Sequence, residues 1–298
     1  MKGNFMTKNL VISGTEYPHK PLDELLNIAE TLGIKNLELW IPHNFKYEDV
    51  GKLGKTLERK GMSAAVISTW TQLNLPGDIN PRQNLIIQSI KAAKALGAKY
   101  VNTYFGGNSE RSVKDALSQY SENILPCLDI ATKEGIVITL ENEFEISGTD
   151  GTRRADFILE LMESINSPYF RANFDPCNFY FAGEEPFPYA YEILKDYIAY
   201  VHLKDGKKYN PKIHPQMEEE FIWKDYSGNY YCCKMGEGAI NYEGLFNALI
   251  KDGYNGYYGL EPHVPPKHLP AMFNQSLNFV KSRLNFNGKE ITYESSTS

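Results

Sequence analysis

Residues 136–143 read IVITLENE, a short apolar run that ends in acidic residues. Side chains alternate between the two sides of a β-strand, so Thr139 and Glu141 share one side. Ile138 and Leu140 share the other. The same alternation recurs in YFRANFDP (169–176), AYVHLKD (199–205) and YYGLEP (257–262). An apolar side suits packing beneath helices and a polar side suits a barrel interior, so these segments predict strands of an α/β barrel.

Eight strand-like segments run through the chain, separated by segments with helical spacing. The expected strands are Leu10–Ser13, Asn36–Trp40, Ser63–Ser68, Lys99–Tyr104, Ile136–Glu141, Tyr169–Asp175, Ala199–Lys204 and Tyr257–Glu261. Among the helical segments, Pro81–Leu96 opens with proline and repeats apolar residues at helical spacing. Alternating strands and helices require parallel pairing, and eight such units close into a single (β/α)₈ TIM barrel. We expect the barrel at 1–285 and a polar C-terminal tail at 286–298.

The main alternative fold is an open doubly wound sheet. That fold usually carries a glycine-rich phosphate turn after an early strand. Here the first expected strand runs into SGTEYPHK (13–20), which has no such turn. Eight units also exceed the usual six, so the pattern favours the barrel.

Composition narrows the classes of function. The 298 residues carry a formal net charge of −6 and no dense Lys/Arg cluster, which disfavours a nucleic-acid partner. No apolar run is long enough to span a membrane, and the N-terminus lacks the apolar core of a secretory signal. The four cysteines form no CxxC pair, which is typical of reduced thiols. We therefore expect a cytoplasmic protein that neither spans nor binds a membrane.

One long polar insertion, at about 206–238, follows the seventh expected strand. It contains FIWKDYSGNYYCCK (221–234), in which Ser-Gly-Asn separates two aromatic-rich runs. That pattern predicts a β-hairpin. In a barrel this loop lies on the face where active sites form, so a lid or a contact with a second copy of the chain would fit. A loop without function is the alternative.

Four potential metal ligands end four successive strands: Glu141, Asp175, His202 and Glu261. Three carboxylates in a narrow barrel mouth would repel one another, and a divalent cation removes that penalty. Oxygen ligands with a single imidazole suit Mn²⁺, Mg²⁺ or Co²⁺, and Zn²⁺ also accepts them. Taken singly, each residue could instead be a helix cap, a salt-bridge partner or a hydrogen-bonded core histidine. Their shared phase favours one divalent-metal site.

A family resemblance runs from the first expected strand to about Leu284 and rests on five fragments between residues 139 and 263. They are TLENE (139–143), NFDPCN (173–178), YVHLKD (200–205), GEGAINYEGLFNAL (236–249) and GLEPH (259–263). These fragments resemble the xylose isomerase-like TIM-barrel superfamily, the sugar phosphate isomerase/epimerase group that includes ketose 3-epimerases and inosose dehydratases. The resemblance implies that Glu141, Asp175, His202 and Glu261 hold the metal, and that Glu141 and Glu261 act as catalytic acid and base.

Two departures from the family pattern bear on the chemistry. Family members often carry histidine three residues after the strand-six aspartate, where this chain has Asn178. Asparagine can hydrogen-bond a hydroxyl but is a poor proton shuttle. The related DNA-endonuclease branch needs several further histidines for a three-metal cluster. The expected strands three and four end in ISTWT and NTYFGGN, without histidine.

The resemblance therefore implies a metal-dependent sugar isomerase or epimerase that abstracts a proton next to the carbonyl of a ketose or polyol-derived substrate. Candidate substrate-binding residues are Lys204, Asn178, Asp205, Glu143, His43 and Trp40, with Arg153 and Trp70 as further candidates. Lys204 could instead form a salt bridge with Asp205 or Glu141, and Asp205 could orient His202 or Lys204. Alternatives are a sugar or inosose dehydratase with the same site, a metal-dependent phosphodiesterase, and a non-catalytic sugar-binding barrel.

Overall fold

The computed structural model describes residues 9–17, 21–107, 110–144, 150–213, 221–225 and 228–284. The expected tail at 286–298 lies outside the described residues. So does Ser227, within the expected hairpin turn.

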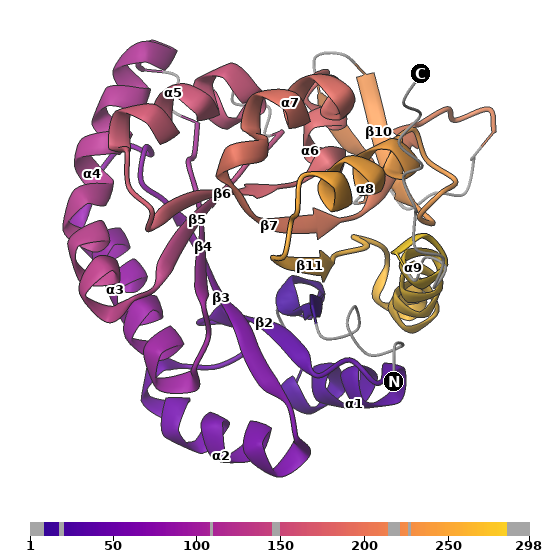
Figure 1. The fold of residues 1–298 in the computed structure, drawn as a ribbon, viewed down its shortest axis with the longest axis horizontal. Coiled ribbons are helices and arrows are strands. Elements are labelled where there is room, and N and C mark those ends of the chain that lie inside the picture. The colour runs from indigo at the N-terminus through magenta and orange to yellow at the C-terminus, as the bar shows by residue number, and fades with distance from the viewer. Residues whose placement is uncertain are drawn as a thin grey trace, which may run out of the picture.

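Eight parallel strands close into a barrel, which confirms the predicted TIM barrel (Figure 1). They are β1 (Leu10–Ser13), β2 (Asn36–Ile41), β3 (Ser63–Gln72), β4 (Tyr100–Tyr104), β5 (Val137–Glu141), β6 (Phe170–Phe174), β7 (Ile198–Leu203) and β11 (Tyr257–Leu260). Their order around the barrel is β1-β11-β7-β6-β5-β4-β3-β2. Each predicted strand is present, with ends shifted by one residue in most cases. The main difference is β3, which continues four residues beyond the expected Ser68.

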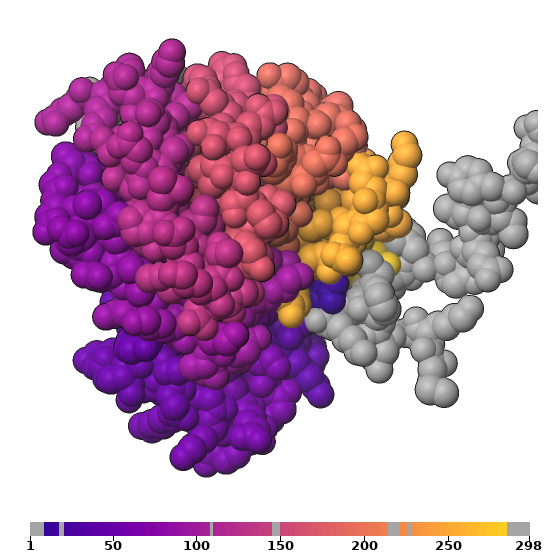
Figure 2. Space-filling model, turned by 60° about the vertical axis from the view of Figure 1, so that its left-hand side comes forward, coloured from indigo at the N-terminus to yellow at the C-terminus, as the bar shows by residue number. Residues whose placement is uncertain are grey.

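Helices cover the outside of the strands (Figure 1). They are α1 (Leu22–Leu32), α2 (Val50–Lys60), α3 (Asn80–Leu96), α4 (Val113–Glu134), α5 (Ala155–Ile165), α6 (Pro176–Phe181), α7 (Tyr191–Leu194), α8 (Tyr242–Lys251) and α9 (Leu269–Leu284). The expected proline-led helix is α3, and Gly97 ends it at a φ of 73°, a left-handed conformation that glycine adopts without a steric penalty. Seen from the side in Figure 2, successive units follow one another across the surface in chain order.

Two apolar clusters reflect the two sides of each strand. The larger lies between the strands and the helices, and includes Ile138 and Leu140, as the alternation predicted. The smaller contains Val11, Ala65, Val66, Tyr100 and Tyr200, whose side chains lie on the opposite side of their strands. This second cluster forms a floor inside the barrel. The polar interior residues lie between that floor and the mouth at the carboxyl ends of the strands.

The insertion after β7 forms a second, antiparallel sheet. Its strands are β8 (Asp205–Lys208), β9 (Trp223–Asp225) and β10 (Gly228–Cys233), in the order β8-β10-β9. The pairing of β9 with β10 joins the two aromatic-rich runs of the sequence. The addition of β8, directly after the last barrel strand, was not predicted. No helix in the described part of the chain is long and apolar enough to cross a membrane.

Candidate metal centre

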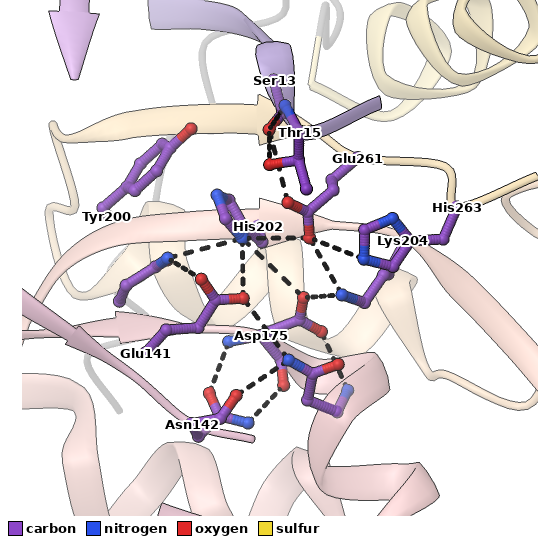
Figure 3. Close-up of polar contacts among 12 residues, drawn as sticks. Ser13, Thr15, Glu141, Asn142, Asp175, Tyr200, His202, Lys204, Glu261 and His263 are labelled. Atoms are coloured by element: carbon purple, nitrogen blue, oxygen red, sulfur yellow. Dashed lines mark hydrogen bonds and ion pairs between the residues drawn. The ribbon is translucent and has the colours of Figure 1, made fainter. Parts of the chain in front are cut away.

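The four predicted ligands come from four neighbouring strands. Glu141 ends β5, His202 lies within β7, and Glu261 directly follows β11. Asp175 directly follows β6 and caps the N-terminus of α6, where its side chain accepts a hydrogen bond from the backbone of Asn178. One ligand atom from each of the four lies within 4.8 Å of the others, and all four residues are buried. Figure 3 shows the four side chains converging at the barrel mouth.

His202 Nδ1 lies at the middle of the group. It is 2.9 Å from Glu141 Oε1, 3.3 Å from Glu261 Oε2 and 4.0 Å from Asp175 Oδ2. Burial alone would lower the pKa of His202, but the surrounding carboxylates outweigh it and raise that pKa well above its ordinary value. This ring nitrogen is therefore surrounded by the three carboxylates with which it would share a metal ion.

The other ring nitrogen of His202 is held by Glu38, a residue for which sequence reasoning assigned no role. Nε2 lies 3.0 Å from Glu38 Oε2. The same Glu38 oxygen accepts a hydrogen bond of 2.9 Å from the Tyr200 hydroxyl, and Ser68 donates to the second oxygen. A carboxylate behind a metal-binding histidine fixes the tautomer and the orientation of the ring. Glu38 thus directs Nδ1 toward the three carboxylates.

Asparagine side chains orient the Glu141 carboxylate. Asn102 and Asn173 donate to Oε2 at 2.8 and 3.0 Å, and Asn178 lies 3.4 Å from Oε1. Of these three, only Asn178 was predicted, and its amide also donates to the backbone oxygen of Asn142 at 2.8 Å. Asn178, at the position where family members often carry histidine, therefore contacts the carboxylate of a candidate ligand.

Lys204 lies inside the centre. Its Nζ is 2.9 Å from both Asp175 Oδ2 and Glu261 Oε2. The alternative interpretation of Lys204 as a salt-bridge residue therefore named the wrong partners, Asp205 and Glu141, and its role in substrate binding stays a prediction. Burial raises the pKa of Asp175 and also opposes ionisation of Glu261. At Glu261, His202 and Lys204 outweigh burial, so its pKa is held well below the ordinary value. The centre thus holds three buried carboxylates and one ammonium group.

Asp205 has a different set of partners from those predicted. Its carboxylate accepts backbone N–H groups of Gly206, Gly236, Gly238 and Ile240 at 2.9–3.4 Å. At Gly238 even a Cβ atom would collide with this carboxylate. The Gly-Glu-Gly segment is therefore fastened to the end of β7 by Asp205. Its predicted role in substrate binding remains a prediction.

His263 lies at the rim of the centre and was missed by sequence reasoning. Its Nδ1 is 2.9 Å from Glu16 Oε1, and its Nε2 is 3.6 Å from Glu261 Oε2 (Figure 3). Burial and Lys204 both lower the pKa of His263, but Glu16 and Glu261 outweigh them and raise it to about 9. The one sequence signal for His263 was its place in the GLEPH fragment, two residues after the predicted ligand Glu261.

The remaining candidates lie at different distances from the centre. Trp40 is buried near the end of β2, whereas His43 is exposed in the turn that follows. Glu143 is buried two residues beyond Glu141, and its charge adds to burial and to the charges of Glu141 and Glu261 in raising the pKa of Tyr104. Arg153 lies 2.6 Å from Asp225 of β9 and so ties the insertion to the loop after β5. The proposed contacts of these residues with a substrate stay predictions.

The donor set fits a divalent cation. Three carboxylates and one imidazole converge on one buried point, and divalent cations accept this combination of ligands. Asp175 Oδ2 is buried and accepts no well-aligned hydrogen bond from the described residues, although Lys204 is near. A buried carboxylate oxygen without a hydrogen bond is uncommon unless an ion or water completes its environment. These four residues form a group that could hold a metal ion.

Comparisons with known proteins agree with this architecture. The chain is 23% identical to hydroxypyruvate isomerase of Escherichia coli (strain K12) over 247 residues, which cover 78% of this chain and 84% of that protein. It is 29% identical to inosose dehydratase of Bacillus thuringiensis (strain Al Hakam) over 140 residues, but that match spans only 46% of this chain and 44% of the dehydratase.

A solved structure of IOLI protein with a bound zinc atom superposes with a TM-score of 0.74 at 16% identity, covering 94% of this chain and 100% of that one. At that identity the likeness concerns the fold. The family model described as xylose isomerase-like TIM barrel matches residues 26–283. That match spans most of the barrel and all four candidate ligands. The chain therefore belongs to the xylose isomerase-like TIM barrel family.

Proposed function

We propose that the protein is a divalent-metal-dependent sugar isomerase or epimerase. It would abstract a proton next to the carbonyl of a ketose or polyol-derived substrate. The observation that carries the proposal is the convergence of Glu141, Asp175, His202 and Glu261 around one buried point. A metal held there would polarise the carbonyl and stabilise the negative charge that develops when the proton leaves. We propose Mn²⁺, Co²⁺, Mg²⁺ or Zn²⁺ as the ion.

The two glutamates have different surroundings, which suits a two-sided proton transfer. Glu141 is held by neutral amide groups, including those of Asn102 and Asn173. Glu261 is held by the Lys204 ammonium group and lies near His263. One glutamate takes the proton from carbon, and the other returns a proton to carbon or oxygen. Two carboxylates in unlike environments are a common basis for separate acid and base roles.

Dehydration is the second candidate, because His263 could supply the acid that it requires. The pKa of His263 is raised to about 9 by Glu16 and Glu261, which outweigh burial and Lys204, so its imidazole is protonated at neutral pH. Loss of water would break a C–H bond next to the carbonyl and a C–O bond at the following carbon. A glutamate would take the proton from carbon, and His263 would protonate the departing hydroxyl.

We propose a small, unphosphorylated sugar or polyol as the substrate rather than nucleic acid. The cations near the centre are already paired: Lys204 with Asp175 and Glu261, and His263 with Glu16. A phosphate group would have to compete with these carboxylates. The net charge of −6 also opposes binding of a polyanion.

The test is a screen of the metal-loaded protein against ketoses, inososes and sugar phosphates in D₂O. Deuterium incorporated into recovered substrate, together with an isomer, would support the isomerase or epimerase. A keto product formed with loss of water would support the dehydratase. Glu261→Gln should abolish turnover in either case while the fold is retained. Turnover that survives both Glu261→Gln and removal of metal would refute the proposal.

A further inference from the structure

Three aromatic side chains line the half of the barrel mouth opposite the metal ligands. Trp40 on β2, Trp70 on β3 and Tyr104 at the end of β4 contact one another, with ring centroids 4.4–6.2 Å apart. Trp40 lies two residues after Glu38, and Trp70 lies two residues after Ser68. Side chains two residues apart share a face of a strand. These three rings, the aromatic wall, therefore form the layer directly above the Glu38–Ser68 contact.

The aromatic wall reaches the metal centre through Asn102. The Asn102 amide lies 3.4 Å from the Tyr104 hydroxyl and donates to Glu141 at 2.8 Å. The ligands come from β5, β6, β7 and β11, whereas the wall comes from β2, β3 and β4. A sugar bound through neighbouring oxygens at the ligand side would therefore extend its remaining carbons toward the wall.

The indole N–H of Trp40 is a polar group in a buried position. The residue is 3% exposed, and its indole Nε1 is buried with no hydrogen-bond partner among the described residues. A buried donor left unpaired is costly, and native structures retain few of them. Trp70, in the same wall, is 46% exposed, so water can reach its edge. Within the wall, the N–H of Trp40 is thus the donor that lacks a partner.

We propose that Trp40 is a specificity-determining residue, whose indole N–H donates a hydrogen bond to a hydroxyl oxygen of the sugar at the end away from the metal ligands. This inference rests on the proposed function and refines its substrate class. A neutral sugar with hydroxyls on one edge and C–H groups on a face matches a wall of uncharged rings with one unpartnered donor. A phosphate at that end would lose its hydration against those rings without meeting a cation of the wall.

The chain itself supplies a direct probe of this hydrogen bond. It contains three tryptophans, Trp40, Trp70 and Trp223, so a ¹H–¹⁵N spectrum shows three indole cross-peaks. Trp70→Phe and Trp223→Phe each remove one cross-peak, which identifies the remaining one as that of Trp40. The Mg²⁺-loaded protein is diamagnetic and can be titrated with D-fructose, D-allulose and D-tagatose. For a ketohexose that binds, we expect the Trp40 indole proton to move downfield, as a proton does when it enters a hydrogen bond.

Affinity measurements test the same hydrogen bond by its removal. Trp40→Phe keeps an aromatic ring and deletes the N–H, and should raise the Kd of the bound ketohexose about 2- to 10-fold, the range for one neutral hydrogen bond. Among monodeoxy analogues of that sugar, the one lacking the accepting hydroxyl should bind wild type and Trp40→Phe equally. Trp70→Phe is the matched control. The ratio of its Kd values for the deoxy analogue and the parent sugar should equal that of wild type.

The outcomes separate this inference from the proposed function. If a ketohexose binds in a metal-dependent way but the Trp40 cross-peak stays in place, Trp40 is not the donor and the inference fails alone. It also fails alone if Trp40→Phe weakens the binding of every deoxy analogue equally. If the metal-loaded protein binds none of the three sugars, the proposed substrate class fails, and the assignment of Trp40 fails with it.

Discussion

Glu38→Gln should weaken metal binding although Glu38 is not itself a ligand. Its carboxylate is buried and accepts hydrogen bonds from the Tyr200 and Ser68 hydroxyls and from His202 Nε2. Glutamine has nearly the same volume but replaces one acceptor oxygen with an NH₂ donor. Whichever way the amide turns, that NH₂ faces at least one group that donates to Glu38. Loss of the carboxylate behind a metal-binding histidine typically costs 10- to 100-fold in affinity, which corresponds to about 1.4–2.7 kcal/mol.

Calorimetric titration of Mn²⁺ or Co²⁺ into chelator-treated protein measures this loss directly. Ser68→Ala is the graded control, because it removes one donor to Glu38 and leaves the contact with His202 intact. Its effect on metal affinity should be several-fold smaller than that of Glu38→Gln. Circular dichroism and the Tm of the metal-free protein establish that both variants fold. A folded Glu38→Gln variant with wild-type metal affinity would show that the orientation of His202 does not depend on Glu38.

Three further predictions follow from the site and its supports. Asp175→Ala should lower metal affinity more than 100-fold and remove the rise in Tm that added metal gives wild type, since ligand binding to the native state raises stability. Arg153→Met should cost about 3–5 kcal/mol by breaking the buried ion pair between Arg153 and Asp225, and should speed proteolysis within 206–238; unchanged cleavage would contradict a tie between loop and insertion. The pKa of His263 is raised to about 9, so its charged form stabilises the metal-free fold fully below about pH 6.5. The stability lost in His263→Gln should therefore be largest near pH 6 and disappear as pH rises through 9; a pH-independent loss would contradict this pairing.

The strand pattern was readable from sequence because alternation and burial coincide at these positions. Ile138 and Leu140 pack under helices while Glu141 points inward. An error of one residue in the expected alternation would have placed all three side chains on the wrong side of the strand. The strand ends were less predictable. Asp175 lies one residue beyond the end of β6, where it is the N-cap of α6 and its backbone no longer pairs with a neighbouring strand. The strand β8 was not predicted because its residues, Asp205–Lys208, are polar and pair only with the insertion.

Sequence reasoning identified the four side chains that converge at the barrel mouth and missed the groups that hold them in place. The candidate ligands are acidic or imidazole side chains at strand ends, where residue type and position both indicate chemistry. Glu38 also lies inward on its strand, but near the middle, and its role depends on a contact with His202 across 164 residues. Asn102 and Asn173 are neutral and gain a role only because both amides reach the same Glu141 oxygen.

The same reasoning explains why the salt bridge considered as an alternative for Lys204 named other partners than those it has. That alternative paired Lys204 with Asp205, its neighbour in sequence, or with Glu141. Closure of the barrel instead places Asp175 from β6 and Glu261 from β11 on either side of the residue that follows β7. Asp205, one residue later, lies on the opposite side, where its carboxylate accepts hydrogen bonds from four backbone N–H groups. Side-chain alternation thus decides which of two adjacent charges enters the centre, and strand order decides which carboxylates it meets there.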